Sequence, residues 1–516
     1  MNTEGETDTI IIVGANPAGL LLAAQLLRFG IHPVVIDRKS SSSKVSPSIL
    51  LQPRTFEIFN QLGLVNELLH AGLECDGLTI QLESEVINYV SYAQWSLESG
   101  SFSLLNIEQR KIEEILINYL AIKACPIYWN SELLSFKQDS NAVRLELNRD
   151  GEITNRAFKW IAVAEEEQFN VKEHLAISYN HWSANRSIYQ LVLRTDELHN
   201  RNQHLFLKKD SFAFATPTND SGSYDFVGSL PKGSALKIGF IDIKEHLDKN
   251  IGFSIPVESD EWHKTTLLQF QLATECYKQR CLLIGNAAFR QSAFVGNEVN
   301  SGIQDAYNIG WKLANICLDK QEESLLNSYR EERKSINDAR FKKDRWLFKL
   351  FKMSTVLPYS KRKYLIKKIL EKSDWFDVDS NYRKSNLSVH HSRGRKIQAG
   401  DRLPFMNVYD EKKQEEIDLF QWCKRPGFVL LVLGNLSNNS LFILAQWMKQ
   451  KYTRYMHLFY LPYSTKNQPV FNAFEVNKDQ NKMILIRPDM YIAYMHDVVN
   501  ASLIDTYMIE VMKWKF

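Results

Sequence analysis

The sequence predicts an α/β protein whose first element is a Rossmann-like βαβ unit. Thr9–Val13 is a short β-branched run typical of a buried strand, and Val34–Ile36 is a second one. Between them, residues 14–19 form a glycine turn, and residues 17–29 repeat apolar side chains at helical spacing before Gly30. Strand, glycine turn, helix and strand in this order are the unit that opens a dinucleotide-binding fold.

The glycine turn carries the chemistry of this unit, with one substitution. A pyrophosphate needs backbone N–H groups at a helix N-terminus and no side chain in its way. The usual pattern G-x-G-x-x-G reads Gly14, Asn16 and Gly19, so Asn16 stands where glycine lets the backbone approach the phosphates. Asparagine tolerates a positive φ, so we expect the turn to form and the side chain to crowd the phosphates. Asp37, after the second strand, is placed to accept ribose hydroxyls. The alternative is a buried βαβ unit without a ligand.

The composition is that of a globular protein of roughly two to four domains. The 516 residues carry a net charge of +3, so no overall field selects a partner and we expect no nucleic-acid binding. Six scattered cysteines without metal-ligand spacing, and dispersed histidines, predict free thiols in a reducing compartment and no metal site. Residues 9–27 are largely apolar, but Gly14, Asn16 and Pro17 interrupt them after an acidic start. We therefore expect a cytoplasmic protein without a targeting segment or transmembrane helix.

Helical and strand patterns alternate along the rest of the chain. Helical spacing over 52–72 pauses at Gly63, and residues 106–121 predict an amphipathic helix. The other expected segments are strands over 77–105 and over 126–164 with a turn at Asp150-Gly151, a β-rich segment over 178–260 with alternating runs such as 236–243, a strand, glycine turn and long helix over 281–317, helices over 320–375, a linker over 376–396, and mixed strands and helices over 397–516.

Four stretches of sequence point to one family. They are residues 14–38, 281–314 (CLLIGNAAFRQSAFVGNEVNSGIQDAYNIGWKLA), 400–434 and 485–494. Together they resemble the FAD-dependent aromatic hydroxylases of the phenol-hydroxylase and polyketide-hydroxylase type. The resemblance implies FAD as cofactor, NAD(P)H as its reductant, and O₂ used to hydroxylate a small aromatic molecule. It also implies a Rossmann-like FAD-binding domain, an inserted β-sheet substrate domain and a C-terminal thioredoxin-like domain.

Domain limits follow from this resemblance. We expect the FAD-binding domain over 1–177 and 261–390, with 77–105 contributing to the substrate domain, the substrate β-sheet over 178–260, and the thioredoxin-like domain over 391–516. The C-terminal domain has one cysteine after Trp422, Cys423, and none at redox spacing. We therefore expect it to pack against the FAD domain or to make contacts in a homodimer, without thiol-disulfide activity.

The family's cofactor-contacting positions carry over to particular residues. They are Gly14, Asn16, Gly19, Asp37, Arg38, Gln109, Asn286, Gly296 and Asn300. Gln109 with Glu113 matches a helix near the flavin. Further matches are Gly285, Ala287, Ala288, Gly302, Asp305, Ala306, Asn308, Trp311, Lys312, Tyr329, Glu332, Arg333, Arg487, Pro488 and Asp489. Because the flavin does the chemistry in such enzymes, no catalytic side chain is named.

Departures from the family pattern fall mostly where FAD is held. Asn286 replaces the aspartate that binds the ribityl chain, which is mild because an amide still hydrogen-bonds a hydroxyl. Glu165-Glu166 replaces Asp-Gly of the middle motif and adds negative charge near a phosphate. Glu298 is expected in the loop that offers N–H groups to the flavin, where a carboxylate opposes a reduced, anionic ring. The remaining changes are Phe169, Lys172, Phe289, Ala293 and Val295.

These departures leave two classes of function open. The first is a FAD-dependent monooxygenase acting on an aromatic or polyketide-like molecule. The second is a non-catalytic binding or scaffold protein that keeps the fold with weak or no FAD binding.

A basic segment stands apart from both classes. Residues 340–372 contain twelve Lys or Arg against Asp344 and Glu371, a net charge of +10, with aromatic residues between them. One interpretation is a helix pair that contacts a membrane surface or an anionic partner. The alternative is a solvated face over a domain-packing surface.

Overall fold

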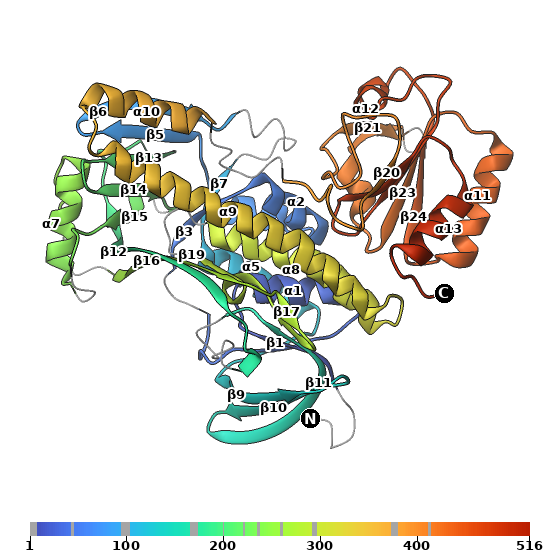
Figure 1. Cartoon of the computed structure of the whole chain (residues 1–516), viewed down its shortest axis with the longest axis horizontal. Coiled ribbons are helices and arrows are strands. Elements are labelled where there is room, and N and C mark those ends of the chain that lie inside the picture. Colours follow the sequence, from blue (N-terminus) through green and yellow to red (C-terminus); the bar gives the residue numbers. More distant parts are fainter. Residues whose placement is uncertain are drawn as a thin grey trace.

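The computed structural model has three lobes, with a central lobe flanked by a second sheet on one side and the C-terminal lobe on the other (Figure 1). The structure describes residues 8–42, 46–93, 104–165, 174–199, 201–219, 222–234, 238–257, 262–291, 297–372, 380–410 and 414–516.

The central lobe is built on an eight-stranded sheet that contains the predicted βαβ unit. Its order is β17-β18-β11-β1-β2-β8, and β10 and β9 continue from β11 as an antiparallel extension. β1 runs parallel to both neighbours, with Ile11 opposite Val34 and Ile161. The strands are β1 (Asp8–Val13), β2 (Val34–Ile36), β8 (Ile127–Tyr128), β9 (Ser131–Gln138), β10 (Val143–Arg149), β11 (Glu152–Val163), β17 (Tyr277–Lys278) and β18 (Cys281–Leu283).

Helices α1 (Pro17–Arg28), α5 (Gln109–Ile122) and α8 (Asn297–Cys317) pack in this lobe. Two glycines let α1 and its turn approach α8. A Cβ on Gly310 would lie 2.8 Å from the Cβ of Gln25, and one on Gly302 would lie 3.2 Å from the Cβ of Ala18. This close crossing brings the N-terminal ends of α1 and α8 to the same edge of the sheet.

A small three-stranded sheet joins the central lobe to the second sheet. Its order is β3-β7-β4, formed by β3 (Ser48–Leu51), β4 (Leu73–Glu74) and β7 (Leu105–Glu108). Helices α2 (Pro53–Leu62) and α3 (Val65–Ala71) lie between β3 and β4 in the chain, and Gly63 ends α2 with φ +76°. The predicted pause at Gly63 is therefore confirmed.

The second sheet also has eight strands, in the order β19-β16-β12-β15-β14-β13-β5-β6. Its strands are β5 (Gly77–Leu82), β6 (Glu85–Ser91), β12 (Tyr179–Arg194), β13 (Asn202–Leu207), β14 (Phe212–Pro217), β15 (Ser223–Ser229), β16 (His263–Ala273) and β19 (Phe289–Gln291). Helix α7 (Phe240–Ile251) covers one face, where Tyr189, Phe226 and Ile243 share a core. The opposite face turns toward the central lobe and the long helices.

Two of those helices follow α8. The short 3-10 turn η2 (Glu323–Leu325) leads into α9 (Leu326–Ser354), which reaches from the central lobe to the second sheet, and α10 (Tyr359–Lys372) lies beside β6 (Figure 1). Phe341 from α9 and Ile366 from α10 are buried with Leu268 and Phe270 of the second sheet.

The C-terminal lobe has a five-stranded sheet in the order β20-β26-β25-β23-β24. β23 and β24 are parallel, and β25 is antiparallel to β23 and to β26. The thioredoxin-like assignment stays a prediction, which this arrangement supports. The elements are β20 (Val389–His391), the hairpin β21 (Asn407–Asp410) and β22 (Glu415–Asp418), η3 (Leu419–Cys423), β23 (Phe428–Leu433), α11 (Asn438–Lys451), β24 (Met456–Leu461), α12 (Gln468–Ala473), β25 (Lys482–Ile486), β26 (Ile492–His496) and α13 (Ala501–Glu510).

Three segments differ from the sequence interpretation. The run 236–243 was expected to be a strand, but α7 begins at Phe240, because Phe240, Ile243, Leu247 and Ile251 place apolar side chains at helical spacing. The expected linker contains β20, which pairs with β26. Strand β16 pairs along β12, so the second sheet extends past the expected limit at residue 260.

Candidate functional site

Gly14 and Gly19 allow the tight turn between β1 and α1 to form. Gly14 has φ +109°, a left-handed conformation that side chains rarely adopt. A Cβ on Gly19 would lie 2.0 Å from the carbonyl oxygen of Gly14, so no larger residue fits there. The predicted tight turn and helix start are therefore present.

Asn16 caps the helix with its own side chain. Its φ is −98°, the extended conformation of an N-cap residue, so the turn forms without the positive φ that asparagine tolerates. The Asn16 Oδ1 accepts from the N–H of Gly19 at 3.1 Å, and its Nδ2 donates to the carbonyl of Ala164 at 3.0 Å. The side chain thus occupies one of the N–H groups with which a helix start binds phosphate.

Asp37 lies at the end of β2, as predicted, and its side chain is fully buried. Its carboxylate accepts from the N–H of Ala15 at 2.8 Å and from the N–H of Lys39 at 2.9 Å. Asp37 therefore ties β2 to the glycine turn. The adjacent Arg38 is exposed.

Two further carboxylates stand near the turn. Glu165 follows β11, and its Cβ would lie 3.3 Å from a Cβ on Gly14, so the predicted acid of the middle motif is beside the glycine turn. Glu113 on α5 is buried and accepts from Gln109 Nε2 at 2.8 Å. Burial raises the pKa of Glu113, and the charges of Asp37 and Glu165 raise it further, against the hydrogen bond from Gln109 and the charge of Lys39. A carboxylate at Glu165 opposes a phosphate bound at the glycine turn, while Lys39 Nζ lies 3.8 Å from Asp37 Oδ2.

We call the glycine turn (residues 14–19), Asp37, and the 3-10 turn η1 (Gly285–Ala287) packed against α8 the cradle. The first wall of the cradle is the glycine turn with Asp37, and the second wall is η1 with α8. Gly285 has φ +53°, and a Cβ on it would lie 2.8 Å from the Cβ of Ala18. Asp305 accepts from the N–H of Gly285 at 3.2 Å and from Arg333 Nε at 2.6 Å. Asn286 therefore sits on a turn held from α8, close to the start of α1.

Asn300 ties α8 to the segment before α2. Its Oδ1 accepts from the N–H of Gln52 at 3.0 Å and from Thr55 Oγ1 at 2.7 Å, and its Nδ2 donates to the carbonyl of Leu50 at 2.9 Å. With its side chain engaged by β3 and α2, Asn300 positions the start of α8.

Glu298 was expected in the flavin loop, and that placement is wrong. It lies in the first turn of α8, where a carboxylate interacts favourably with the helix dipole. Phe289 is buried in β19. Several other predicted residues lie outside the described residues: Glu166, Phe169, Lys172, Ala293, Val295 and Gly296.

Sequence reasoning missed a buried polar group where the second sheet meets the three-stranded sheet. Asp225 on β15 accepts from the N–H of Ser48 at 2.7 Å and from Gln190 Nε2 at 2.9 Å. Nearby, Gln203 Nε2 donates to Asn106 Oδ1 at 3.3 Å. Burial raises the pKa of Asp225 to about 6. The available signal was an acid inside the apolar run of β15, SYDFVGS.

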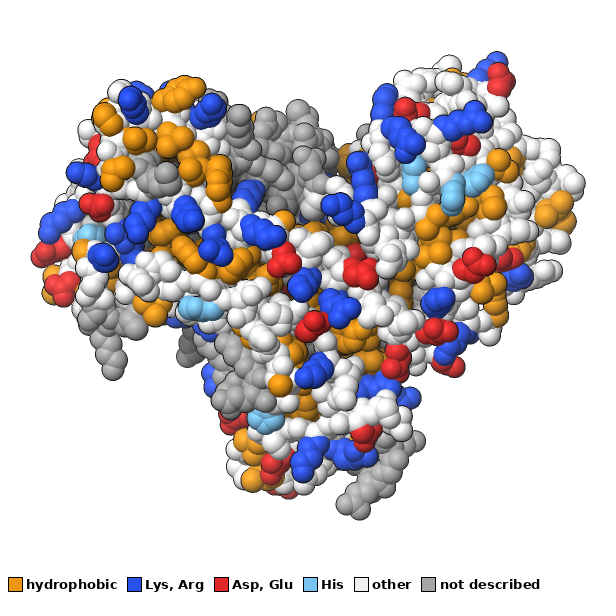
Figure 2. Space-filling model, viewed as in Figure 1, with side chains coloured by type: hydrophobic (Ala, Val, Ile, Leu, Met, Phe, Trp, Pro, Cys, Tyr) orange, Lys and Arg blue, Asp and Glu red, His pale blue; other side chains and the backbone are white. Residues whose placement is uncertain are grey.

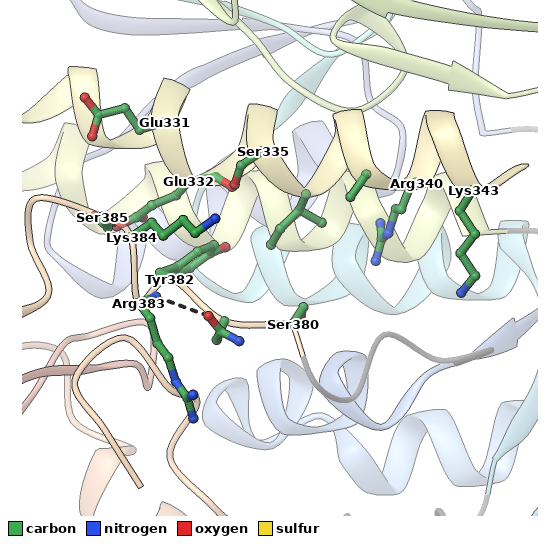
Figure 3. A pocket seen from close by; sticks show the side chains of 13 residues that line it. Glu331, Glu332, Ser335, Arg340, Lys343, Ser380, Tyr382, Arg383, Lys384 and Ser385 are labelled. Atoms are coloured by element: carbon green, nitrogen blue, oxygen red, sulfur yellow. Dashed lines mark hydrogen bonds between the residues drawn. The ribbon is translucent and has the colours of Figure 1, made fainter. Parts of the chain in front are cut away.

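A separate cleft of about 540 Å³ lies between α9 and residues 380–385 (Figure 3). Two of its charged residues are already engaged: Glu332 pairs with Arg487 at 2.6 Å, and Arg383 pairs with Asp401 at 2.6 Å. This cleft is part of the junction with the C-terminal lobe and lies apart from the glycine turn.

The FAD binding domain family model matches residues 6–343. This chain belongs to the FAD binding domain family. Its sequence is 28% identical over 336 residues to 6-methylpretetramide 4-monooxygenase of Streptomyces rimosus, covering 64% of this chain and 60% of that protein. It is 25% identical over 440 residues to pentachlorophenol 4-monooxygenase of Sphingobium chlorophenolicum, covering 82% of this chain and 79% of that protein.

Solved structures extend the likeness to the whole fold. The flavin-dependent monooxygenase PieE, in complex with FAD and substrate, has a TM-score of 0.82 at 15% identity and covers 99% of this chain and 100% of its own. Aklavinone-11 hydroxylase, in a ternary complex with FAD and aklavinone, has a TM-score of 0.78 at 17% identity with the same coverage. The predicted α/β fold of the FAD-dependent hydroxylases is therefore confirmed.

The frame of the cradle fits the adenine dinucleotide of FAD, the cofactor of this family. The left-handed Gly14, the packed Gly19 and Asp37 after β2 supply the turn, and Gly285 and Gly302 bring the second wall close. Within the described ranges, no helix is long and apolar enough to cross a membrane, and no cluster of His, Cys, Asp or Glu suits a metal ion.

Proposed function

We propose that this protein is a FAD-dependent monooxygenase that uses NAD(P)H and O₂ to hydroxylate an aromatic or polyketide-like small molecule. The observation that carries the proposal is the cradle: the glycine turn, Asp37 and the η1–α8 wall meet at one edge of the sheet. The whole-length likeness to hydroxylases with bound FAD supports it.

The chain's own groups divide the binding task. Asp37 would accept ribose hydroxyls, and the start of α1 would face the pyrophosphate once the Asn16 side chain turns aside. Gln109 and Asn286 would reach the rest of the cofactor. When bound, FAD supplies the redox chemistry by accepting hydride from NAD(P)H and activating O₂.

The inner face of the second sheet is suited to hold the substrate. Ile188, Val227, Phe270 and Leu272 on this face are buried and apolar, so they would shield a ring held against them from water. Gln190, Gln203 and Asp225 add polar groups that could orient a hydroxylated aromatic molecule at the junction with the three-stranded sheet.

Two observations favour a second candidate, a binding protein with weak FAD affinity. Asn16 uses the N–H of Gly19, and Glu165 sits beside Gly14. Both oppose a pyrophosphate, one by occupying a donor and the other by its charge.

The deciding experiment is reconstitution with FAD followed by NADPH oxidation and O₂ uptake, with and without a panel of phenols. We expect flavin reduction that an aromatic substrate accelerates. Failure to take up FAD at millimolar concentration supports the binding protein. A homodimer and a cytoplasmic location stay predictions from the sequence, to be tested by light scattering and by cell fractionation.

A further inference from the structure

Helices α9 and α10 carry an unusual outward surface. On α9, Lys342, Arg345, Trp346, Lys349 and Lys352 are all exposed. They lie at positions i, i+3, i+4, i+7 and i+10, which places them on one side of the helix. On α10 and the turn before it, the same spacing joins Leu357, Lys361, Tyr364 and Lys368. We call these nine residues and Val356 the α9–α10 face.

The apolar members of this face are uncovered. Trp346 is 55% exposed, Tyr364 67% and Val356, in the turn between the helices, 84%. In the space-filling view, hydrophobic side chains gather over these helices at the upper left, with Lys and Arg around them (Figure 2). A face that only kept the helices solvated would need the lysines but no large aromatic side chains.

The inner sides of the same helices account for domain packing. Phe341 and Ile366 are buried in the core of the second sheet. Arg362 pairs with Glu83 at 2.9 Å, and Lys363 pairs with Glu85. Acidic residues of the second sheet thus neutralise inward-side cations, while six cations remain on the outward face.

We propose that the α9–α10 face binds the surface of anionic membranes. A lipid surface supplies what this face lacks: a plane of negative charge for the six cations, and an interfacial layer in which Trp and Tyr rings are stable. Val356 and Leu357 at the turn would enter the boundary between headgroups and acyl chains. An acidic protein would complement the charges but would leave the aromatic rings unexplained.

Sedimentation with sucrose-loaded vesicles tests this proposal. We expect the full-length protein to bind vesicles of phosphatidylcholine with phosphatidylserine, and to leave vesicles of phosphatidylcholine alone in the supernatant. Because screening weakens surface electrostatics, binding should fall steeply between low salt and physiological salt.

Two variants separate charge from ring insertion. Replacing Lys342, Lys349, Lys361 and Lys368 with Gln should weaken binding by about 500-fold, at about fivefold for each lysine near the surface. Trp346→Ser combined with Tyr364→Ser should weaken it by about tenfold. The matched control replaces four exposed lysines elsewhere, Lys137, Lys159, Lys449 and Lys478, with Gln and should leave binding unchanged.

Three results would overturn the proposal. The first is that the protein does not bind anionic vesicles. The second is that the control variant loses as much binding as the variant of the four face lysines. The third is that the Trp346 and Tyr364 variant binds vesicles as the wild type does, and that the wild type binds soluble polyglutamate as tightly as it binds anionic vesicles. Circular dichroism and thermal unfolding of each variant show whether it is folded, so that loss of binding is not loss of structure.

Discussion

Two regions of the molecule match the family pattern to different degrees. They are the junction with the C-terminal lobe and the cradle at the start of α1. At the junction the family residues are present and buried. Arg487 binds both Glu332 oxygens at 2.6 and 3.0 Å, Lys312 Nζ donates to Glu332 at 2.8 Å, and Arg487 also pairs with Asp489. Glu332 on α9 is thus satisfied by cations from two other segments, and Asp489 by the nearby Arg487.

In the cradle, the matched residues divide into two kinds. Gly14, Gly19 and Gly285 are kept, and each has a backbone conformation or a close neighbour that excludes a side chain. Asn16 and Asn286, which would contact the cofactor, are changed. The comparison teaches that the departures at Asn16 and Asn286 fall on positions that would face FAD, whereas the residues that fix the backbone match the family pattern, as does Asp37, which would also contact FAD.

The strongest test of this difference breaks the junction. Arg487→Met should lower the free energy of unfolding by about 3–5 kcal/mol, because Glu332 and Asp489 are left as buried charges without their guanidinium. Urea unfolding followed by tryptophan fluorescence measures it. The matched control is Arg144→Met, whose pair with Asp139 has the same N–O distance of 2.6 Å but is exposed, and it should have no measurable effect. Equal effects in the two variants would contradict a structural role for the junction.

Two buried acids should respond to pH with opposite signs. Burial raises the pKa of Glu332, but Arg487 and Lys312 outweigh it and hold that pKa well below its usual range. Its stabilisation is present at neutral pH and is lost on acidification. The pKa of Asp225 is raised to about 6 by burial, so its contribution is present below the ordinary pKa and is lost as pH rises through about 6.

In the wild type, the free energy of unfolding should fall by up to about 3 kcal/mol as the pH rises from about 4 to about 6. Asp225→Asn should remove this fall. Gln190 can turn its amide so that its oxygen accepts from the new Asn. Unfolding midpoints across this pH range provide the measurement, and Asp479→Asn, an exposed acid, is the control. A variant that keeps the wild-type pH profile would show that Asp225 does not titrate there.

Glu165 offers a smaller test, within the cradle. Glu165→Gln should tighten FAD binding by about tenfold, because it removes one negative charge near the pyrophosphate. Glu114→Gln, on the same lobe but partly exposed on α5, is the control and should change the affinity little. Fluorescence quenching of FAD on titration measures both. Equal affinities in wild type and the Glu165 variant would show that this carboxylate turns away from the cofactor.

The smallest expected effect concerns Cys423. Burial raises the pKa of its thiol to about 12, so the thiolate is scarce at neutral pH. The wild type should reduce insulin only at the background rate, and Cys423→Ser should leave that rate unchanged. Measurable activity that depends on Cys423 would refute the prediction that the C-terminal lobe has no thiol-disulfide function.

Local patterns in the sequence predicted the βαβ unit well. β1, α1 and β2 came from the spacing of apolar residues and glycines, and they match to within a residue or two. The prediction of a strand over residues 236–243 was wrong. The alternation of apolar and polar residues there overlaps the first turn of α7, whose apolar face continues to Ile251. Glu298 was misplaced because an alignment of motifs does not show where the loop ends and α8 begins.

Site residues whose role depends on distant partners were harder to find. Asn16 bonds the carbonyl of Ala164, 148 residues away, so its capping conformation could not be read from the turn alone. Asp225 meets Ser48 across 177 residues. The junction was predicted as family residues, but only the fold shows that Arg487, Glu332 and Lys312 form one ionic network.

The central claim is that the backbone of the cradle is intact but its contacts to FAD are weakened. The most direct test is the dissociation constant for FAD in two proteins. Titration of FAD into wild type and into Asn16→Gly combined with Asn286→Asp compares them, with the exposed Asn141→Gly as control. The account predicts a wild-type Kd above about 1 μM and at least about tenfold tighter binding by the double variant, since each change restores a contact. Submicromolar binding by the wild type, unchanged in the double variant, would contradict it.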